Sequence, residues 1–501
     1  MKIGELEEKL ADYGSGGYYL LEVFVIQLLR IEIESEGKKL QYTDQGSRVS
    51  FDAIAPLGIG NIPGPLLIEI KASLTARSIE NLASLLKRYP NSEDFSLLII
   101  SFRELTVDKE YFEDVAGLVK GKLFVWDSND LQKLIDKHEN EARGISDKLF
   151  SLRLQNTIES DQAPWSDRRD DIIREIGRSY NAGRFSLMLG AGVSSSAGLP
   201  DWNTLLNSLF VSMLTGNDDE RSKSDHEHVS SIVKRLRQVD GPSALTLARY
   251  IRKGMTKGST AEQNEFISSV TQSLYGLRDG RRSISSALIK GIVDLCAPSR
   301  TGAKLTAIIT YNFDDLIERE LKARDLVHKS IFEDVDLASP DELPVYHVHG
   351  FLPEKRDAYP NIDKGTLVFS EEGYHQIYRD AYHWSNLVQL SSLRETCCLM
   401  IGLSLTDPNL RRLLEIAAKS NDKPKHFAFL RRISYEEFMK VDGKNIVSAS
   451  KAMVEKFLDR HHKLNEQVLV ELGVNLVWYE NHDEIPALLK EIIRSQRGKH
   501  S

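Results

Sequence analysis

Apolar and polar positions along residues 1–153 follow a pattern that predicts a mixed α/β domain. A long apolar stretch with helical spacing, YYLLEVFVIQLLRIEIES, leads into two strand-like segments, SRVSFDAIAPLG and PLLIEIKAS. We expect a helix over RSIENLASLLKRY, strands over FSLLIIS and KLFVWDS, and a closing helix after them. Residues 154–170 are polar and show no period, which predicts a linker.

A second α/β pattern covers residues 171–501 and predicts a larger sheet. The helix DIIREIGRSYNAG and the strand FSLMLG lead into a glycine-rich loop and then into the helix NTLLNSLFVSML. Residues 215–303 are mainly helical in pattern, as either an inserted subdomain or a mobile lid. Further strands are predicted over LTAIITYNF, PVYHVHG, TLVF, CCLMIGLSL, HFAFLR and VNLVWYEN. Strands that alternate with helices favour a mostly parallel sheet, which binds ligands beyond the carboxyl ends of its strands.

Length and composition agree with two or more globular domains. The chain has 501 residues, of which 41% are hydrophobic and 28% charged. No apolar run approaches the roughly 20 residues of a membrane-spanning helix, and the acidic start MKIGELEEKLADYG is unlike a secretory signal. We therefore expect a cytoplasmic protein with no membrane partner. The net charge of −8 gives no global attraction to nucleic acid but leaves room for a local basic groove.

Three cysteines, Cys296, Cys397 and Cys398, predict neither a disulfide framework nor a zinc site. The sequence contains no C-x-x-C spacing, and two of the cysteines are adjacent in an apolar run. We interpret all three as small buried apolar residues.

Polar residues follow four of the predicted strands, at the edge where a parallel sheet presents its chemistry. In GAGVSSSAGLPDW, Gly190 and Gly192 suit a tight turn whose backbone N–H groups face a phosphate, and Ser194–Ser196 add hydroxyl groups. The three later segments contribute Asn312, Asp314 and Asp315 in TYNFDDL, His349 in YHVHG, and Gly402, Ser404, Asp407 and Asn409 in GLSLTDPNLRRLL.

Some residues in these segments have a simpler structural interpretation. Asp407 and Pro408 suit the start of a helix, and Asp315 is interpreted as a charge at a helix start. We expect His347, two positions before His349 and so on the same strand face, to pack or hydrogen-bond in the interior.

The four segments, in this order, resemble motifs of the sirtuin-like NAD-binding family over roughly residues 171–495. They are similar to its first glycine loop, its asparagine–aspartate motif, its catalytic histidine motif and its late ribose-binding loop. The resemblance implies a Rossmann-like sirtuin-type parallel sheet with a helical insertion, His349 as general base and Asn312 beside the nicotinamide. It also implies contacts with the dinucleotide for Gly190, Ala191, Gly192, Ser194, Asp314, Gly402 and Ser404, and places Asp201 and Trp202 in a flexible loop over the nicotinamide ribose.

One departure from the family pattern favours water as the acceptor. Deacetylating sirtuins carry a four-cysteine zinc module, which three cysteines cannot build. The chain is then more similar to sirtuin-like proteins of bacterial antiphage defence, which hydrolyse NAD⁺ to nicotinamide and ADP-ribose and arrest or kill infected cells. A histidine that titrates near neutrality suits the proton transfer, and an amide can hold water or a ribose hydroxyl. The resemblance further implies a homo-oligomer that is activated by assembly and can pair with a HerA-type hexameric ATPase.

The N-terminal segment carries the pattern of a second, metal-dependent site. Glu69 and Lys71 share one face of a strand, where Asp52 can join them from the neighbouring strand. Two carboxylates can hold Mg²⁺, which activates water, while the lysine assists the nucleophile or the phosphate. The arrangement resembles the Mrr-like restriction-endonuclease fold, whose first-helix glutamate corresponds to Glu22.

Two alternatives to the NAD⁺ hydrolase stay open at this point. The first is a metal-dependent DNA nuclease whose sirtuin-like domain senses NAD⁺ or ADP-ribose. The second is an assembly scaffold with neither activity, in which the charges of the N-terminal domain are only solvated or paired.

Overall fold

The computed structural model describes most of the chain. The described residues are 2–6, 15–41, 51–71, 74, 82, 95–104, 123–159, 164–215, 244–255, 260–298 and 302–494, with short gaps within 361–366, at 381, at 420–422 and within 442–449. The helix predicted over RSIENLASLLKRY lies outside them except for Leu82, and so does the charged segment GNDDERSKSDHEH.

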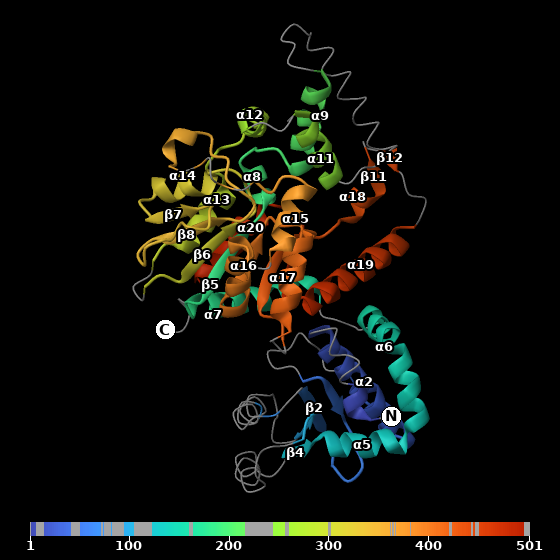
Figure 1. Ribbon diagram of the computed structural model, residues 1–501. Coiled ribbons are helices and arrows are strands. Elements are labelled where there is room, and N and C mark those ends of the chain that lie inside the picture. The colour runs from blue at the N-terminus through green and yellow to red at the C-terminus, as the bar shows by residue number, and fades with distance from the viewer. Residues whose placement is uncertain are drawn as a thin grey trace. The chain divides into compact units, whose positions relative to one another are not determined.

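The chain divides into two compact units (Figure 1). The N-terminal unit comprises Met1–Asp171, Glu415–Pro424 and Ile433–Asn475, and the C-terminal unit comprises Ile172–Leu414, Lys425–Arg432 and Leu476–Ser501. Two segments that the sequence pattern assigned to the second domain, 415–424 and 433–475, are therefore grouped with the N-terminal unit.

The N-terminal unit contains a four-stranded sheet in the order β1-β2-β3-β4. Its strands are β1 Ala53–Ala55, β2 Leu66–Lys71, β3 Ser96–Ser101 and β4 Leu123–Trp126. Its helices include α2 Ser15–Ser35, α5 Ser128–Lys137, α6 Glu139–Glu159, α18 Tyr435–Met439 and α19 Lys451–Glu471, and β11 Lys440–Val441 pairs with β12 Lys444–Asn445. β1 runs antiparallel to β2, whereas β2, β3 and β4 are parallel.

The N-terminal core explains the apolar character of its first helix. Phe24, Leu28 and Ile33 of α2 are fully buried in one cluster with Ile68 of β2. The start of α5 is specified by its own sequence, because the Asp127 side chain accepts hydrogen bonds from backbone N–H groups of the first turn and completes a capping box. The predicted strands of this domain are present, whereas a restriction-endonuclease-like fold stays a prediction.

The described residues of the expected linker over 154–170 are largely helical, and its role as a linker stays a prediction. Helix α6 extends to Glu159, and α7 (Trp165–Asn181) begins six residues later. Its polar side chains have partners on the protein, since Arg168 pairs with Glu466 at 2.8 Å and the Arg169 guanidinium lies 5.1 Å from the centre of the Trp165 ring. The sequence pattern predicted α7 only from residue 171, because the apolar positions with helical spacing begin there, at Ile173 and Ile176.

The C-terminal unit is built on a seven-stranded sheet in the order β13-β10-β9-β5-β6-β8-β7. Its strands are β5 Phe185–Leu189, β6 Leu305–Thr310, β7 His328–Ile331, β8 Leu343–His347, β9 Cys397–Ile401, β10 His426–Arg431 and β13 Val474–Tyr479. β5 is parallel to both β6 and β9, and the pairs β6–β8, β7–β8 and β9–β10 are parallel as well. The predicted parallel sheet is confirmed.

Helices cover this sheet and extend beyond it (Figure 1). They are α7, α8 Ala191–Ser196, α9 Trp202–Thr215, α11 Ala244–Met255, α12 Thr260–Gly276, α13 Ala287–Cys296, α14 Leu316–Ala323, the 3₁₀ turn η2 Arg356–Ala358, α15 Glu371–Arg379, α16 Trp384–Glu395, α17 Pro408–Ala418 and α20 Glu484–Arg494. The main core contains buried residues of α7, α13, α14 and α20 together with the central strands. A smaller cluster joins α9, α11 and α12 to Phe313 and Phe369.

Several predicted elements differ from the structure. The segment TLVF is not a strand over 367–369. Val368 and Phe369 are buried although they lie in a loop, and Phe369 belongs to the smaller cluster, so their apolar character reflects burial and not strand pairing. Strand β7 was not predicted, since this short edge strand is polar and only half-buried over most of its length. The glycine loop is itself helical from Ala191.

The strand order reverses at β5: the strands β6, β8 and β7 lie on one side of it, and the later strands β9, β10 and β13 lie on the other. At that point Gly190 N–H donates to the Ile401 carbonyl at 2.9 Å, and Gly192 N–H donates to the Gly402 carbonyl at 3.0 Å. Gly402 has φ of +70°, and a Cβ atom there would lie 2.6 Å from Val193 N. These glycines therefore allow two loops to touch backbone to backbone.

We expect Gly402→Ala to destabilise the C-terminal unit more than Gly183→Ala, which serves as the matched control. Both glycines have positive φ, but an added Cβ at Gly183 meets no atom within 4 Å. The control therefore reports only the cost of placing alanine at positive φ, about 1–2 kcal/mol of unfolding free energy or a few degrees in the thermal midpoint. Gly402→Ala should lower the midpoint at least twice as far. Equal shifts in the two thermal unfolding curves would contradict the close-contact argument.

Candidate functional site

The four polar loops of the C-terminal unit follow four neighbouring parallel strands, β9, β5, β6 and β8. Since parallel strands end at the same edge, their loops lie where an open α/β sheet binds ligands. Two polar groups stand out at this edge, one around Asn312 and one around His349.

Asn312 ties the loop after β6 to the loop after β5. Its Nδ2 donates to the Gly190 carbonyl at 3.0 Å and to Ser194 Oγ at 2.8 Å. Its backbone N–H donates to Thr310 Oγ1 at 3.1 Å. Both Nδ2 contacts are made within the protein, whereas Oδ1 makes no hydrogen bond with any described residue. The amide is thus held with its acceptor side available.

Ser194 and Asp314 complete this buried group. Ser194 Oγ donates to Asp314 Oδ2 at 2.5 Å, and Asp314 Oδ1 accepts from Leu316 N–H at 3.1 Å. Burial raises the pKa of Asp314 to about 6, although these two hydrogen bonds favour the ionised form. The Ser194 hydroxyl is therefore used inside the protein, as are the Gly190 and Gly192 N–H groups, and the phosphate cradle expected from the sequence is not formed by these groups.

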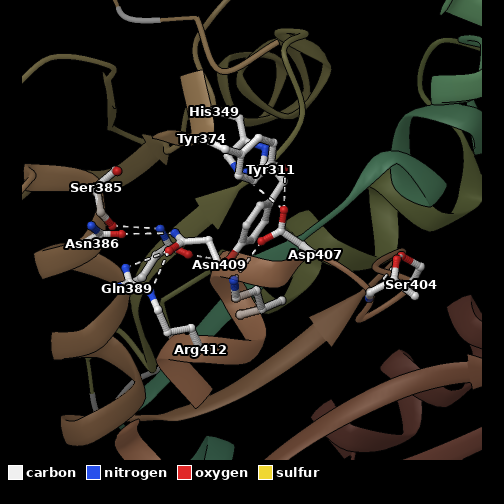
Figure 2. A network of polar contacts seen from close by, with 12 residues as sticks. Tyr311, His349, Tyr374, Ser385, Asn386, Gln389, Ser404, Asp407, Asn409 and Arg412 are labelled. Atoms are coloured by element: carbon white, nitrogen blue, oxygen red, sulfur yellow. Dashed lines mark hydrogen bonds and ion pairs between the residues drawn. The ribbon is translucent and has the colours of Figure 1, made fainter. Parts of the chain in front are cut away.

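His349 lies in the second group, enclosed by aromatic rings (Figure 2). It comes two residues after the end of β8, so it does not share a strand face with His347 as we expected. The ring meets Tyr311 and Tyr374 edge-on, with centroids 4.8 and 5.6 Å away. Its Nε2 is buried without a hydrogen-bond partner among the described residues and lies 4.0 Å from Asp407 Oδ2.

The environment of His349 favours its neutral form. Burial lowers the pKa of the imidazole below its ordinary value, and the nearby Asp407 carboxylate opposes that shift. A neutral imidazole with an unpartnered nitrogen can accept a proton, which is the property required of a general base.

Asp407 has a second role that sequence reasoning missed. It caps α17 as expected, because Oδ1 accepts from Leu410 N–H at 2.7 Å. Its other oxygen, Oδ2, accepts from Tyr374 O–H at 2.5 Å and faces His349 (Figure 2). The capping signal was visible in the sequence, whereas the distant Tyr374 offered no spacing that could reveal the pair.

The remaining predicted NAD⁺ contacts lie at different depths. Asp201 is exposed, and its Oδ1 accepts from Thr204 N–H at 2.7 Å at the start of α9. Trp202 is half-buried, with its ring 5.0 Å from Phe369 and 6.0 Å from Phe313. Ser404 is exposed at the surface. Asp201 and Trp202 thus lie at the start of α9. Their role over a ribose stays a prediction.

Three neighbouring residues have structural roles. The expectation for His347 is confirmed, since it is buried and hydrogen-bonded to Glu318 at 2.6 Å. Asp315 precedes α14 as expected, but its carboxylate pairs with Arg319 at 2.7 Å instead of capping the helix. Asn409 Nδ2 donates to Asn386 Oδ1 at 3.0 Å (Figure 2).

Fold and site together define a parallel α/β domain whose polar loops converge at the carboxyl ends of neighbouring strands. Within it, residues 306–448 match the family model of the SIR2-like domain. This part of the C-terminal region is therefore similar to SIR2-like domains. The match includes Asn312, His349 and Gly402 but not the glycine loop after β5.

A curated protein is similar over a longer part of the chain. The NAD(+) hydrolase ThsA of Enterococcus faecium is 22% identical over 327 residues, which are 64% of this chain and 57% of ThsA. The chain thus spans little more than half the length of this relative.

The N-terminal unit brings Asp52, Glu69 and Lys71 together as the alternation predicted. Lys71 Nζ contacts Glu69 Oε1, and Asp52 Oδ2 accepts from Ile70 N–H at 2.6 Å. Burial, with Asp52 and Glu69 nearby, raises the pKa of Glu22 to about 8, and burial with Glu69 raises that of Asp52 to about 7.

Among the described residues, no group of three or more His, Cys, Asp or Glu side chains is arranged to hold a metal ion. Mg²⁺ binding and nuclease activity stay predictions without a structural observation in their favour.

The predicted burial of the three cysteines is confirmed. Cys296, Cys397 and Cys398 are unpaired and buried, and burial raises their pKa values to about 12. In the described part of the chain, no helix combines the length and the apolar character needed to cross a membrane.

The carboxylates of the N-terminal unit predict that its stability falls as pH rises. The folded state keeps protons on Glu22 and Asp52 up to about pH 8 and 7, whereas unfolded carboxyls release them near pH 4. Because the folded state binds more protons between these limits, raising the pH through this window destabilises it. Hydrogen exchange of peptides covering β2, corrected for intrinsic rates, should be at least tenfold faster at pH 8 than at pH 5, because a pKa difference of one unit already corresponds to roughly 1.4 kcal/mol, a factor of ten.

Glu22→Gln should reduce this pH dependence, and Glu34→Gln, at an exposed position of the same helix, should preserve it. Protection that is independent of pH in the unmodified protein would show that these carboxyls are ionised when folded.

Proposed function

We propose that the C-terminal unit hydrolyses NAD⁺ to nicotinamide and ADP-ribose, and that the chain acts in antiphage defence by depleting NAD⁺. The main support is His349, buried at the carboxyl edge of the sheet with an unpartnered Nε2. The SIR2-like match and the similarity to an NAD(+) hydrolase agree with this proposal.

The proposed reaction breaks the bond between ribose C1′ and the nicotinamide nitrogen. Its electron pair leaves with nicotinamide as a neutral ring, and the oxygen of water forms the new bond to C1′. The water proton passes to His349 Nε2, which is neutral because burial disfavours the imidazolium. Asn312 Oδ1 would accept a hydrogen bond from the water or a ribose hydroxyl, while its Nδ2 contacts keep the amide in one orientation.

Water as the acceptor also agrees with the cysteines. A four-cysteine zinc module cannot be built from three cysteines, and Cys296, Cys397 and Cys398 are all buried in the core of the C-terminal unit. We therefore propose hydrolysis rather than deacylation of a protein substrate.

We further propose that activity depends on assembly into a homo-oligomer and on a partner such as a HerA-type ATPase. The support is the family resemblance and the toxicity of uncontrolled NAD⁺ depletion. Assays of NAD⁺ hydrolysis should therefore be run with and without the protein encoded beside this gene.

His349→Ala and Asn312→Ala should each lower the rate of nicotinamide release at least about 100-fold, because each removes a group that acts on the attacking water. The control is His328→Ala, at the edge strand β7, where the ring hydrogen-bonds through Nδ1 to the Leu326 carbonyl. Products are measured by chromatography with NAD⁺, under the condition in which the unmodified protein is active. Full activity in both site variants would contradict the proposal.

The rate should stay high to a lower pH than an ordinary histidine allows. Since burial lowers the pKa of His349, the imidazole becomes protonated, and can no longer accept a proton from water, only below about pH 6.5. Asp407→Asn keeps the helix-capping oxygen but removes the charge that stabilises the imidazolium, so the acid limb of kcat should move further down. A limb that moves up in Asp407→Asn would refute this account of the His349 environment.

A further inference from the structure

A second histidine of the C-terminal unit, His347, lies fully inside the protein between two hydrogen-bond acceptors. Its side chain is 0% exposed, its Nε2 lies 2.6 Å from Glu318 Oε1, and its Nδ1 lies 3.2 Å from the Asn312 carbonyl oxygen. The Glu318 side chain is 2% exposed. The proposed reaction gives neither residue a direct part.

The two acceptors fix where the protons lie. A carbonyl oxygen can only accept, so Nδ1 of His347 must carry a proton and donate it to Asn312. A second proton lies between Nε2 and Glu318 Oε1, because two bare lone pairs 2.6 Å apart would repel each other. The ring is thus fixed by a carboxylate on one side and directs one N–H at the backbone of Asn312.

We propose that His347, held by Glu318, is a positioning residue that fixes Asn312 for the reaction. This inference rests on the proposed NAD⁺ hydrolysis. Thr310 Oγ1 holds the Asn312 N–H and His347 holds the Asn312 carbonyl, so both backbone groups of this loop residue are fixed. That backbone in turn sets the direction in which Asn312 Oδ1 points.

Packing and a further hydrogen bond hold the pair in place. The His347 ring lies 4.0 Å from the Phe351 ring, centroid to centroid. Ser330 Oγ donates to Glu318 Oε1 at 3.3 Å, while Glu318 Oε2 is buried without a hydrogen-bond partner among the described residues. Removing the contact to Glu318 therefore leaves a buried carboxylate poorly compensated and costs stability.

Two substitutions separate positioning from a purely structural role. In His347→Asn, the amide nitrogen takes the place of Nδ1 and can still donate to the Asn312 carbonyl, but the contact with Glu318 is lost. In His347→Gln, the amide nitrogen takes the place of Nε2 and can still donate to Glu318, but the contact with Asn312 is lost. A structural role requires His347→Gln to be the better variant in both stability and kcat.

The positioning role predicts opposite orders for the two properties. His347→Gln should be the more stable variant in thermal unfolding, yet its kcat for NAD⁺ should fall about 10- to 100-fold, since small misplacements of a reacting group have effects of this size. His347→Asn should be less stable and keep the higher kcat, and KM should change less than kcat in both. A kcat that follows stability, or that equals the unmodified value in both variants, overturns the inference.

A readout without substrate keeps the test decisive if a variant does not fold. In the unmodified chain labelled with ¹⁵N-histidine, the His347 Nδ1 signal should be that of a protonated nitrogen, as its contact with the Asn312 carbonyl requires. The signal is assigned by its loss in a histidine variant or by its proximity to Phe351. An unprotonated Nδ1 contradicts the inference whatever the activity. An unmodified protein that never releases nicotinamide, with or without its partner, contradicts the proposed function instead.

Discussion

The direct contact between the loops after β5 and β9 is the constraint on which the C-terminal unit depends. Gly190 and Gly192 donate their N–H groups to the end of β9 and to Gly402, and no side chain fits between them. This contact lies where the strand order reverses, which in open α/β sheets is where ligands bind. The glycines therefore set how closely the two loops can lie, and the polar residues that follow take their positions from that spacing.

Polar contacts then extend from this point to the neighbouring strand. Asn312 bridges to Gly190 and Ser194, and Asp314 accepts from Ser194 in a fully buried position. Hydrogen bonds of this kind stabilise an interior only when every member has a partner, because an unpaired buried group is costly. Among the described residues, Asn312 Oδ1 at the network and His349 Nε2 beyond it have no hydrogen-bond partner, and an incoming group could pair with both.

The sequence predicted the strands of the sheet and the residues at its edge better than the contacts between them. Strand runs such as FSLMLG and LTAIIT are continuous and apolar because both faces are buried, so they were easy to recognise. The approach of Tyr374 to Asp407 could not be predicted, since it joins a helix and a loop 33 residues apart with no shared spacing. Likewise, the amide groups of Gly190 and Gly192 were expected to face a ligand, but the neighbouring loop, which no local pattern specifies, accepts their hydrogen bonds.

The smaller apolar cluster links helices α9, α11 and α12 to Phe313, the residue next to Asn312. Phe313 packs in that cluster with Leu206 of α9, Ile251 of α11 and Val270 of α12, while its own backbone carbonyl accepts from Leu352 N–H at 2.6 Å. Interiors are close-packed, so these helices cannot shift as a body and leave the Phe313 ring where it is. A displacement of α9, α11 or α12 would therefore also move the loop after β6, at the residue next to Asn312.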